Sequence, residues 1–84
     1  MNNEDKLQFR TSDLALASAL TAVGFSLNNI LKSSSGRASF IFLWTKELQE
    51  VIDIYWSDSM TVNPKVYFDS LKHLKTRLYS GSQQ

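Results

Sequence analysis

The stretch Ala38–Trp44, ASFIFLW, is the longest nearly unbroken apolar run of the chain and its densest cluster of aromatic residues. Its β-branched and aromatic content is typical of a strand, and it is too short to span a membrane. Side chains alternate across a strand, so Phe40 and Phe42 share one face while Ile41 points to the other. Both faces are largely apolar. We therefore expect a central strand with helices packed on both sides.

Length and composition are those of one small globular domain. The 84 residues are 43% hydrophobic and 20% charged, which allows a single modest core. We expect one domain, 1–84, in which residues 1–5 and 81–84 are disordered tails. The absence of cysteine excludes disulfides and fits a reducing cytoplasm. The opening MNNEDK is not a signal peptide and no apolar run approaches about 20 residues, so we expect a cytoplasmic protein without a membrane span.

Upstream of the central strand, the sequence predicts a short strand and a buried helix. Residues 6–10 alternate between apolar and polar, which favours an edge strand. Residues 11–13, TSD, favour a helix start, because a hydroxyl can accept from the free N–H groups of the first turn and an acid suits the helix dipole. The helix is expected to end near Val23, where Gly24 can adopt the left-handed conformation. Its interior is small or apolar nearly all round, which indicates burial.

A β-hairpin is predicted between this helix and the central strand. Residues 25–31 favour a second strand, which turns Leu27 and Leu31 to one face and Ile30 to the other. The loop KSSSGR then punctuates the chain between two apolar runs. Gly36 can supply any positive φ that the turn requires.

Two amphipathic helices are predicted after the central strand. Thr45 can cap the first, and Asn63 can cap the second with Pro64 in its first turn. The apolar positions of the first helix are Leu48, Val51, Ile52, Tyr55 and Trp56. Those of the second are Tyr67, Leu71, Leu74 and Leu78, with Phe68 alongside.

These elements predict an α+β fold in the order β-α-β-β-α-α. The β-hairpin packs against three helices, and the strand at residues 6–10 is an optional third strand at its edge. Two strands alone are marginally stable in water, so the helices must cover them.

Charge is unevenly distributed, although the formal net charge is only +1. Residues 45–58 hold one basic and four acidic side chains, a net charge of −3, whereas residues 59–84 hold four basic and one acidic, a net charge of +3. Such a molecule is bipolar. It can attract an acidic partner with one side while the other side repels it.

Five motifs together resemble a small bacterial and phage-associated family known only as a domain of unknown function. The resemblance covers most of residues 9–80, and its motifs, in order, are RTSDLALASAL, GRASFIFLW, the pair Tyr55-Trp56, NPKVYF and LKHLKTRLYS. It implies a compact intracellular domain found near mobile elements. It supplies no activity and no functional residues. It raises the expectation of a phage or mobile-element accessory protein that binds nucleic acid or another protein.

Side chains suited to catalysis or metal binding are scarce. His73 is the only histidine and is predicted to be a surface or boundary residue. Glu47, Glu50 and Asp53 recur on one helical face and could hold a hard cation, but a solvated acidic face explains them better. We therefore expect no enzyme, no catalytic or metal site, no cofactor and no small-molecule substrate.

A first group of binding candidates is basic. Lys32 and Arg37 flank the serine-rich loop, whose backbone N–H groups could cradle an anion. Four cations of the last helix could follow a phosphate backbone while an aromatic ring stacks on a base. These helix residues are Lys65, Lys72, Lys75 and Arg77, with Tyr79 as the aromatic. They support nucleic-acid binding as the alternative hypothesis.

The second group of candidates is aromatic. So small a body cannot fully bury Tyr55, Trp56 and Tyr67 together with its other rings, so some must be exposed. Exposed aromatic side chains are common anchors for a protein partner or a symmetric dimer. We therefore expect a non-enzymatic intracellular interaction module that binds a protein partner or itself through these residues.

Overall fold

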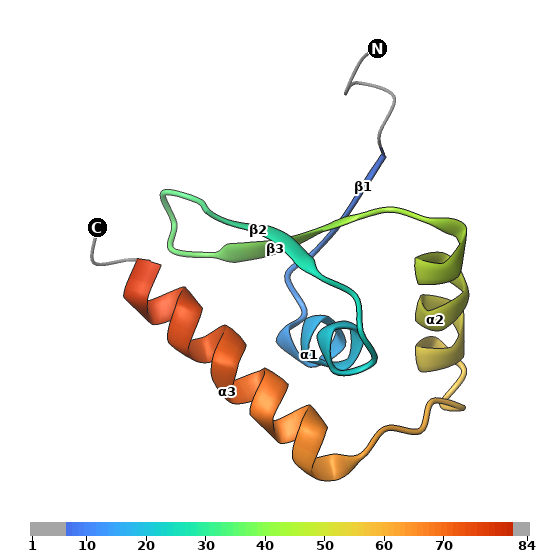
Figure 1. The fold of residues 1–84 in the computed structure, drawn as a ribbon. Helices are drawn as coiled ribbons and strands as arrows, with labels where there is room; N and C mark the ends of the chain where they lie inside the picture. Colours follow the sequence, from blue (N-terminus) through green and yellow to red (C-terminus); the bar gives the residue numbers. More distant parts are fainter. Residues whose placement is uncertain (1–6, 82–84) are drawn as a thin grey trace.

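The computed structural model of this chain describes residues 7–81, which form three antiparallel strands and three helices (Figure 1). The α+β class and the order β-α-β-β-α-α are as predicted, and the optional edge strand is present. Lys6 and the expected tails 1–5 and 82–84 lie outside the described residues, while Gly81 is the last residue of the final helix. In chain order the elements are β1 (Gln8–Thr11), α1 (Leu14–Ala22), β2 (Leu27–Lys32), β3 (Ala38–Leu43), α2 (Lys46–Trp56) and α3 (Pro64–Gly81).

The sheet has the order β1-β3-β2, so the ASFIFLW stretch is its middle strand, as predicted. Phe9 pairs with Phe42 on one side of β3, and Ile30 pairs with Phe40 on the other. The β2–β3 hairpin closes where the Gly36 N–H donates to the Ser33 carbonyl at 2.9 Å. Gly36 has φ +87°, so it supplies the positive φ expected of it.

The predicted faces of β2 are wrong for a specific reason. The register with β3 shifts between Leu27 and Asn29, which indicates a β-bulge, and an extra residue reverses the alternation beyond it. Leu27 and Ile30 therefore both pack against the core, whereas Leu31 turns away from it and is 42% exposed.

Local signals set the start of each helix. The predicted caps Thr45 and Asn63 both accept hydrogen bonds from first-turn N–H groups, at 3.0 Å for Thr45 and at 2.9 and 3.1 Å for Asn63. At α1 the Asp13 carboxylate, not a hydroxyl, is the cap and accepts from two N–H groups at 2.9 and 3.2 Å. The Thr11 hydroxyl accepts from the Asp13 N–H instead, at 3.0 Å. These hydrogen bonds thus fix the turn of the chain between the end of β1 and the start of α1.

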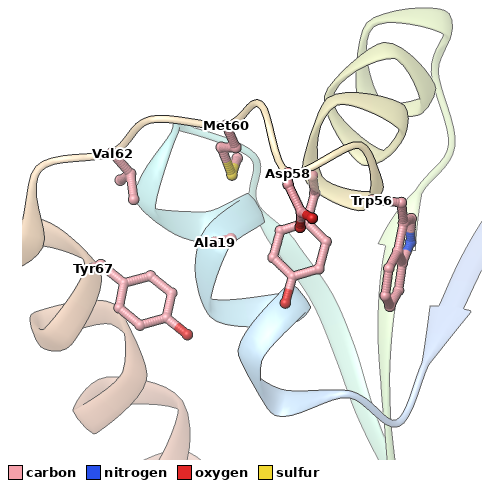
Figure 2. Close-up of a pocket in the computed structure, with 7 residues that line it drawn as sticks. Ala19, Trp56, Asp58, Met60, Val62 and Tyr67 are labelled. Carbon is pink, nitrogen blue, oxygen red and sulfur yellow. The ribbon is translucent and has the colours of Figure 1, made fainter.

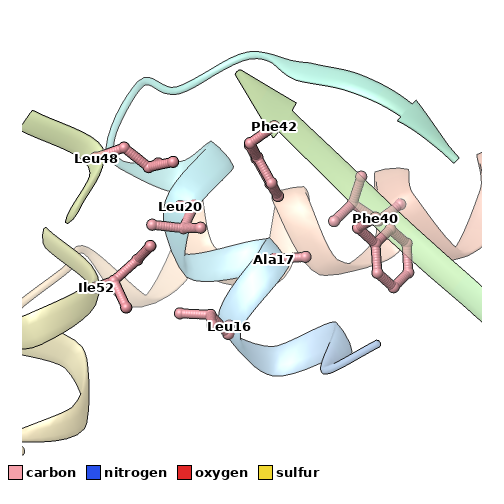
Figure 3. Close-up of a cluster of buried hydrophobic side chains, with 8 residues drawn as sticks. Leu16, Ala17, Leu20, Phe40, Phe42, Leu48 and Ile52 are labelled. Atoms are coloured by element: carbon pink, nitrogen blue, oxygen red, sulfur yellow. The ribbon is translucent and has the colours of Figure 1, made fainter. Parts of the chain in front are cut away.

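The core forms around α1, which lies beneath the sheet between α2 and α3 (Figure 1). Five consecutive residues of α1, from 16 to 20, are buried, as the sequence predicts. Phe40 and Phe42 project from β3 onto this helix, and α2 contributes two side chains from the flank (Figure 3). The buried cluster consists of Leu16, Ala17, Leu20, Phe40, Phe42, Leu48, Ile52 and Leu74.

The opposite face of the sheet has no helix over it in residues 7–81 (Figure 1). The expectation that helices cover β3 on both sides is therefore wrong. Leu43 on that face is 44% exposed. Ile41 is only 2% exposed, because in register it stands between Arg10 of β1 and Asn29 of β2.

Candidate functional site

The three predicted interface residues, Tyr55, Trp56 and Tyr67, converge on one hollow of about 490 Å³. It lies where the end of α2, the connector 57–63 and the first turn of α3 meet the middle of α1. Figure 2 shows Trp56 and Tyr67 on opposite sides of it, with Met60 and Val62 entering from the connector. The lining residues, called the aromatic hollow below, are Ala19, Tyr55, Trp56, Asp58, Met60, Val62 and Tyr67.

The end of α2 places an acid in this hollow. The Asp58 N–H donates to the Tyr55 carbonyl and the Ser59 N–H to the Ile54 carbonyl, both at 3.1 Å. This pair of bonds is the Schellman motif, whose left-handed residue is usually glycine. Here Asp58 occupies that position with φ +61°. A carboxylate therefore stands at the mouth of the hollow at some cost in backbone energy.

Two of the rings are held at different depths. Tyr67 is half-buried, and its hydroxyl donates to the Ala15 carbonyl at 3.4 Å. Trp56 is 62% exposed and packs edge to face on Tyr55, with ring centroids 5.0 Å apart. The hollow therefore combines an exposed Trp56 ring with a Tyr67 ring that is half-buried and hydrogen-bonded.

The electrostatics of the aromatic hollow favour a cation. Burial raises the pKa of the Tyr55 phenol above 10.0, and the neighbouring Asp13, Tyr67 and Asp58 raise it further. Three aromatic side chains and one carboxylate line the hollow, and no Lys or Arg in the described part of the chain does. Aromatic faces attract Lys and Arg side chains, most strongly at Trp.

A second hollow, of about 290 Å³, lies on the helix-free face of the sheet at its hairpin end. It contains the predicted cations Lys32 and Arg37, and β1 brings Arg10 beside them. The loop N–H groups of Ser33 and Gly36 do not cradle an anion, because they donate to carbonyls within the turn. The lining, called the basic hollow below, is Arg10, Ser12, Leu31, Lys32, Ser33, Arg37 and Ser39.

The predicted cations of α3 are exposed but do not form one cluster. Lys65 is engaged in an ion pair with Asp69 at 3.2 Å. At 3.6 residues per turn, Arg77 lies about 140° around the helix from Lys72, and Lys65 and Lys75 are about 15 Å apart along it. Tyr79 is 62% exposed near the end of the helix. At the same spacing Lys65, Lys72 and Lys75 fall within about 80° of one another around the helix, so nucleic-acid contact along this side stays a prediction.

His73 is exposed on α3. Within residues 7–81 no group of three His, Asp or Glu side chains is placed so that it could hold a metal ion. None of the described helices is both long and apolar enough to cross a bilayer.

Some lining residues escaped prediction from the sequence. Met60 and Val62 belong to a connector without periodicity, and Ala19 is simply a small residue on a buried helix. Asp58 precedes serine in a turn-like segment, but the sequence gives only a weak signal that an aspartate will adopt the left-handed conformation. Arg10 could have been found by pairing its strand beside β3, which places it next to the hairpin.

One family model, described as Domain of unknown function (DUF5659), matches residues 6–80. The match includes both hollows. No curated protein and no solved structure is detectably similar to the chain. The resemblance to a family of unknown function is thereby confirmed, while its bacterial or phage setting stays a prediction.

Proposed function

We propose that this chain, which belongs to the DUF5659 family, is a non-enzymatic interaction module whose aromatic hollow binds a protein partner. The single observation that carries the proposal is the convergence of Tyr55, Trp56 and Tyr67, from two helices, on one hollow. Its volume of about 490 Å³ suits one large side chain with its flanking backbone. A phage or mobile-element setting is part of this proposal and rests on the sequence resemblance alone.

The partner is expected to insert an Arg or Lys side chain. The ring of Trp56 is exposed and available for a cation, and Asp58 supplies the counter-charge. A guanidinium can stack on an aromatic face and donate to a carboxylate at the same time. The stem of the same side chain would cover the apolar surface of Met60 and Val62.

Selection from a displayed peptide library against the immobilised protein tests this proposal. Peptides recovered on the wild type should share a basic residue next to apolar ones. Trp56→Ala should weaken the best of them by about tenfold or more, the effect of losing an interface anchor. Ile54→Ala is the matched control, because Ile54 is on the same helix, 44% exposed and outside the aromatic hollow.

Two outcomes would contradict the proposal. Peptides that bind Trp56→Ala as well as they bind the wild type would show that the aromatic hollow is not the site. Acidic consensus peptides would show that the predicted charge preference is wrong. A dimer in sedimentation equilibrium that Trp56→Ala dissociates would instead identify a second copy of this chain as the occupant.

A further inference from the structure

We infer that the basic hollow on the helix-free face of the sheet is a binding site for phosphate groups. It is distinct from the aromatic hollow and is built on the opposite side of the sheet. Its charged lining residues are Arg10, Lys32 and Arg37, and no acid of the described residues 7–81 lines it. Three serine side chains, Ser12, Ser33 and Ser39, complete the lining with hydroxyls that can donate to oxyanion oxygens.

Sheet pairing brings these residues together from distant parts of the sequence. Arg10 lies on β1 in register with Ile41, whereas Arg37 directly precedes β3. Ser39 of β3 is two residues from Arg37 and two from Ile41, the register partner of Arg10. The two arginines therefore border one patch of the sheet, one from β1 and one from the hairpin loop, and a bound anion would lie above Ser39.

Arg37 is already oriented for this role. Its Nε donates to the Ser12 hydroxyl at 3.4 Å, which ties the hairpin loop to the corner between β1 and α1. A guanidinium carries five N–H donors, so the terminal ones stay available for bidentate contact with a phosphate. Lys32 also lines the hollow, but its ammonium is directed to the helix side of the sheet, where it donates to the Leu78 carbonyl of α3 at 3.5 Å. The two arginines therefore supply the charge of the site.

The cations of the basic hollow have no competing anion among the described residues. The one ion pair of residues 7–81 joins Lys65 to Asp69, away from this face. Within residues 7–81, Arg10 and Arg37 thus have no carboxylate partner. Two arginine side chains that meet at one hollow, with no carboxylate among residues 7–81 to neutralise them, attract an oxyanion. Because hydrogen bonds from a guanidinium are directional, this attraction is short-ranged and depends on the geometry of the anion.

NMR titration of the full chain with sodium pyrophosphate, at constant ionic strength, tests the inference. The chain has three arginines, and the Nε–H signals of Arg10 and Arg37 should shift and saturate together, while that of Arg77 on α3 should not move. Arg10→Gln and Arg37→Gln should each weaken binding by about tenfold, as expected for one charge-assisted hydrogen bond. Lys46→Gln, on α2 outside the hollow, removes the same charge and should leave binding unchanged.

Further measurements on the same sample distinguish the source of the phosphate. Tighter binding of a short single-stranded oligonucleotide than of pyrophosphate would identify nucleic acid, and pyrophosphate binding alone would identify a small phosphorylated ligand. Equal shifts of all three arginines, or equal weakening by Lys46→Gln, would overturn the inference, as would the absence of saturable shifts. If Arg10→Gln does not fold, Arg37→Gln decides the matter, since Arg37 lies in the loop.

Discussion

Replacing Asp58 by glycine should make the protein more stable and its aromatic hollow less effective. Asp58 has φ +61° in the position of a Schellman motif that glycine usually fills. A residue with a Cβ loses about 1 to 2 kcal/mol in the left-handed region, and aspartate is at the lower end of that range. The carboxylate also lies at the negative end of the α2 dipole, which is unfavourable by about 0.3 to 1 kcal/mol.

Glycine has an opposing effect, because its greater freedom in the unfolded chain costs about 0.5 to 1 kcal/mol. The balance is a stabilisation of about 1 kcal/mol for Asp58→Gly, or a Tm higher by about 4 to 8 °C in a domain of this size. Asp58→Asn is the matched variant, because it removes the charge but keeps a side chain that tolerates the left-handed region. It should gain about 0.5 kcal/mol, the dipole contribution alone.

Thermal and urea unfolding followed by circular dichroism measure these differences, and both variants should bind a basic peptide more weakly than the wild type. A less stable Asp58→Gly would refute the reasoning, because it would mean that the carboxylate supports the fold. A variant that is more stable but binds the peptide equally well would show that the backbone strain at residue 58 does not serve binding. In that case Asp58 has no part in recognising the cation.

Three other predictions concern the core and the alkaline limit. Phe42→Ala should lower the free energy of unfolding by about 3 to 5 kcal/mol in urea titration, because Phe42 is 1% exposed in the core cluster. Leu43→Ala, its exposed neighbour, should change stability by about 0.5 kcal/mol or less, and an equal loss would mean that the outer face is covered. Ser18→Ala should stabilise by about 1 kcal/mol, since the buried Ser18 hydroxyl has no hydrogen-bond partner; a lower Tm would contradict this. The raised pKa of Tyr55 means that the folded state keeps a proton that the unfolded state loses, so stability should fall as the pH rises above 10.0, and Tyr55→Phe should reduce that fall in pH-dependent melting.

Features encoded by neighbouring residues could be predicted from the sequence. Caps at Thr45 and Asn63 and the left-handed glycines at 24 and 36 depend on a few consecutive residues, and the structure contains them all. The middle strand was equally clear, because ASFIFLW is apolar on both faces. Local chemistry therefore predicted most of the fold.

Features that depend on pairing between distant segments could not be predicted in this way. The bulge after Leu27 exists only in relation to β3, and it reverses the faces assigned to Leu31. Arg10 joins the basic hollow only because β1 pairs beside β3. Trp56 falls on the apolar stripe of α2 by spacing, but α2 ends there and the ring emerges beyond the core.

The uneven charge along the sequence corresponds to two separate regions of the folded protein. The acidic segment 45–58 contains α2 and Asp58, the basic segment contains α3, and α1 separates the two helices (Figure 1). A basic partner would therefore be steered toward the α2 side of the aromatic hollow and repelled from α3, and its association should slow as salt screens this field. The basic hollow faces away on the other side of the sheet, where no described acid opposes a phosphate. The two proposed sites would thus attract ligands of opposite charge, and their separation by the sheet would let both be occupied at once.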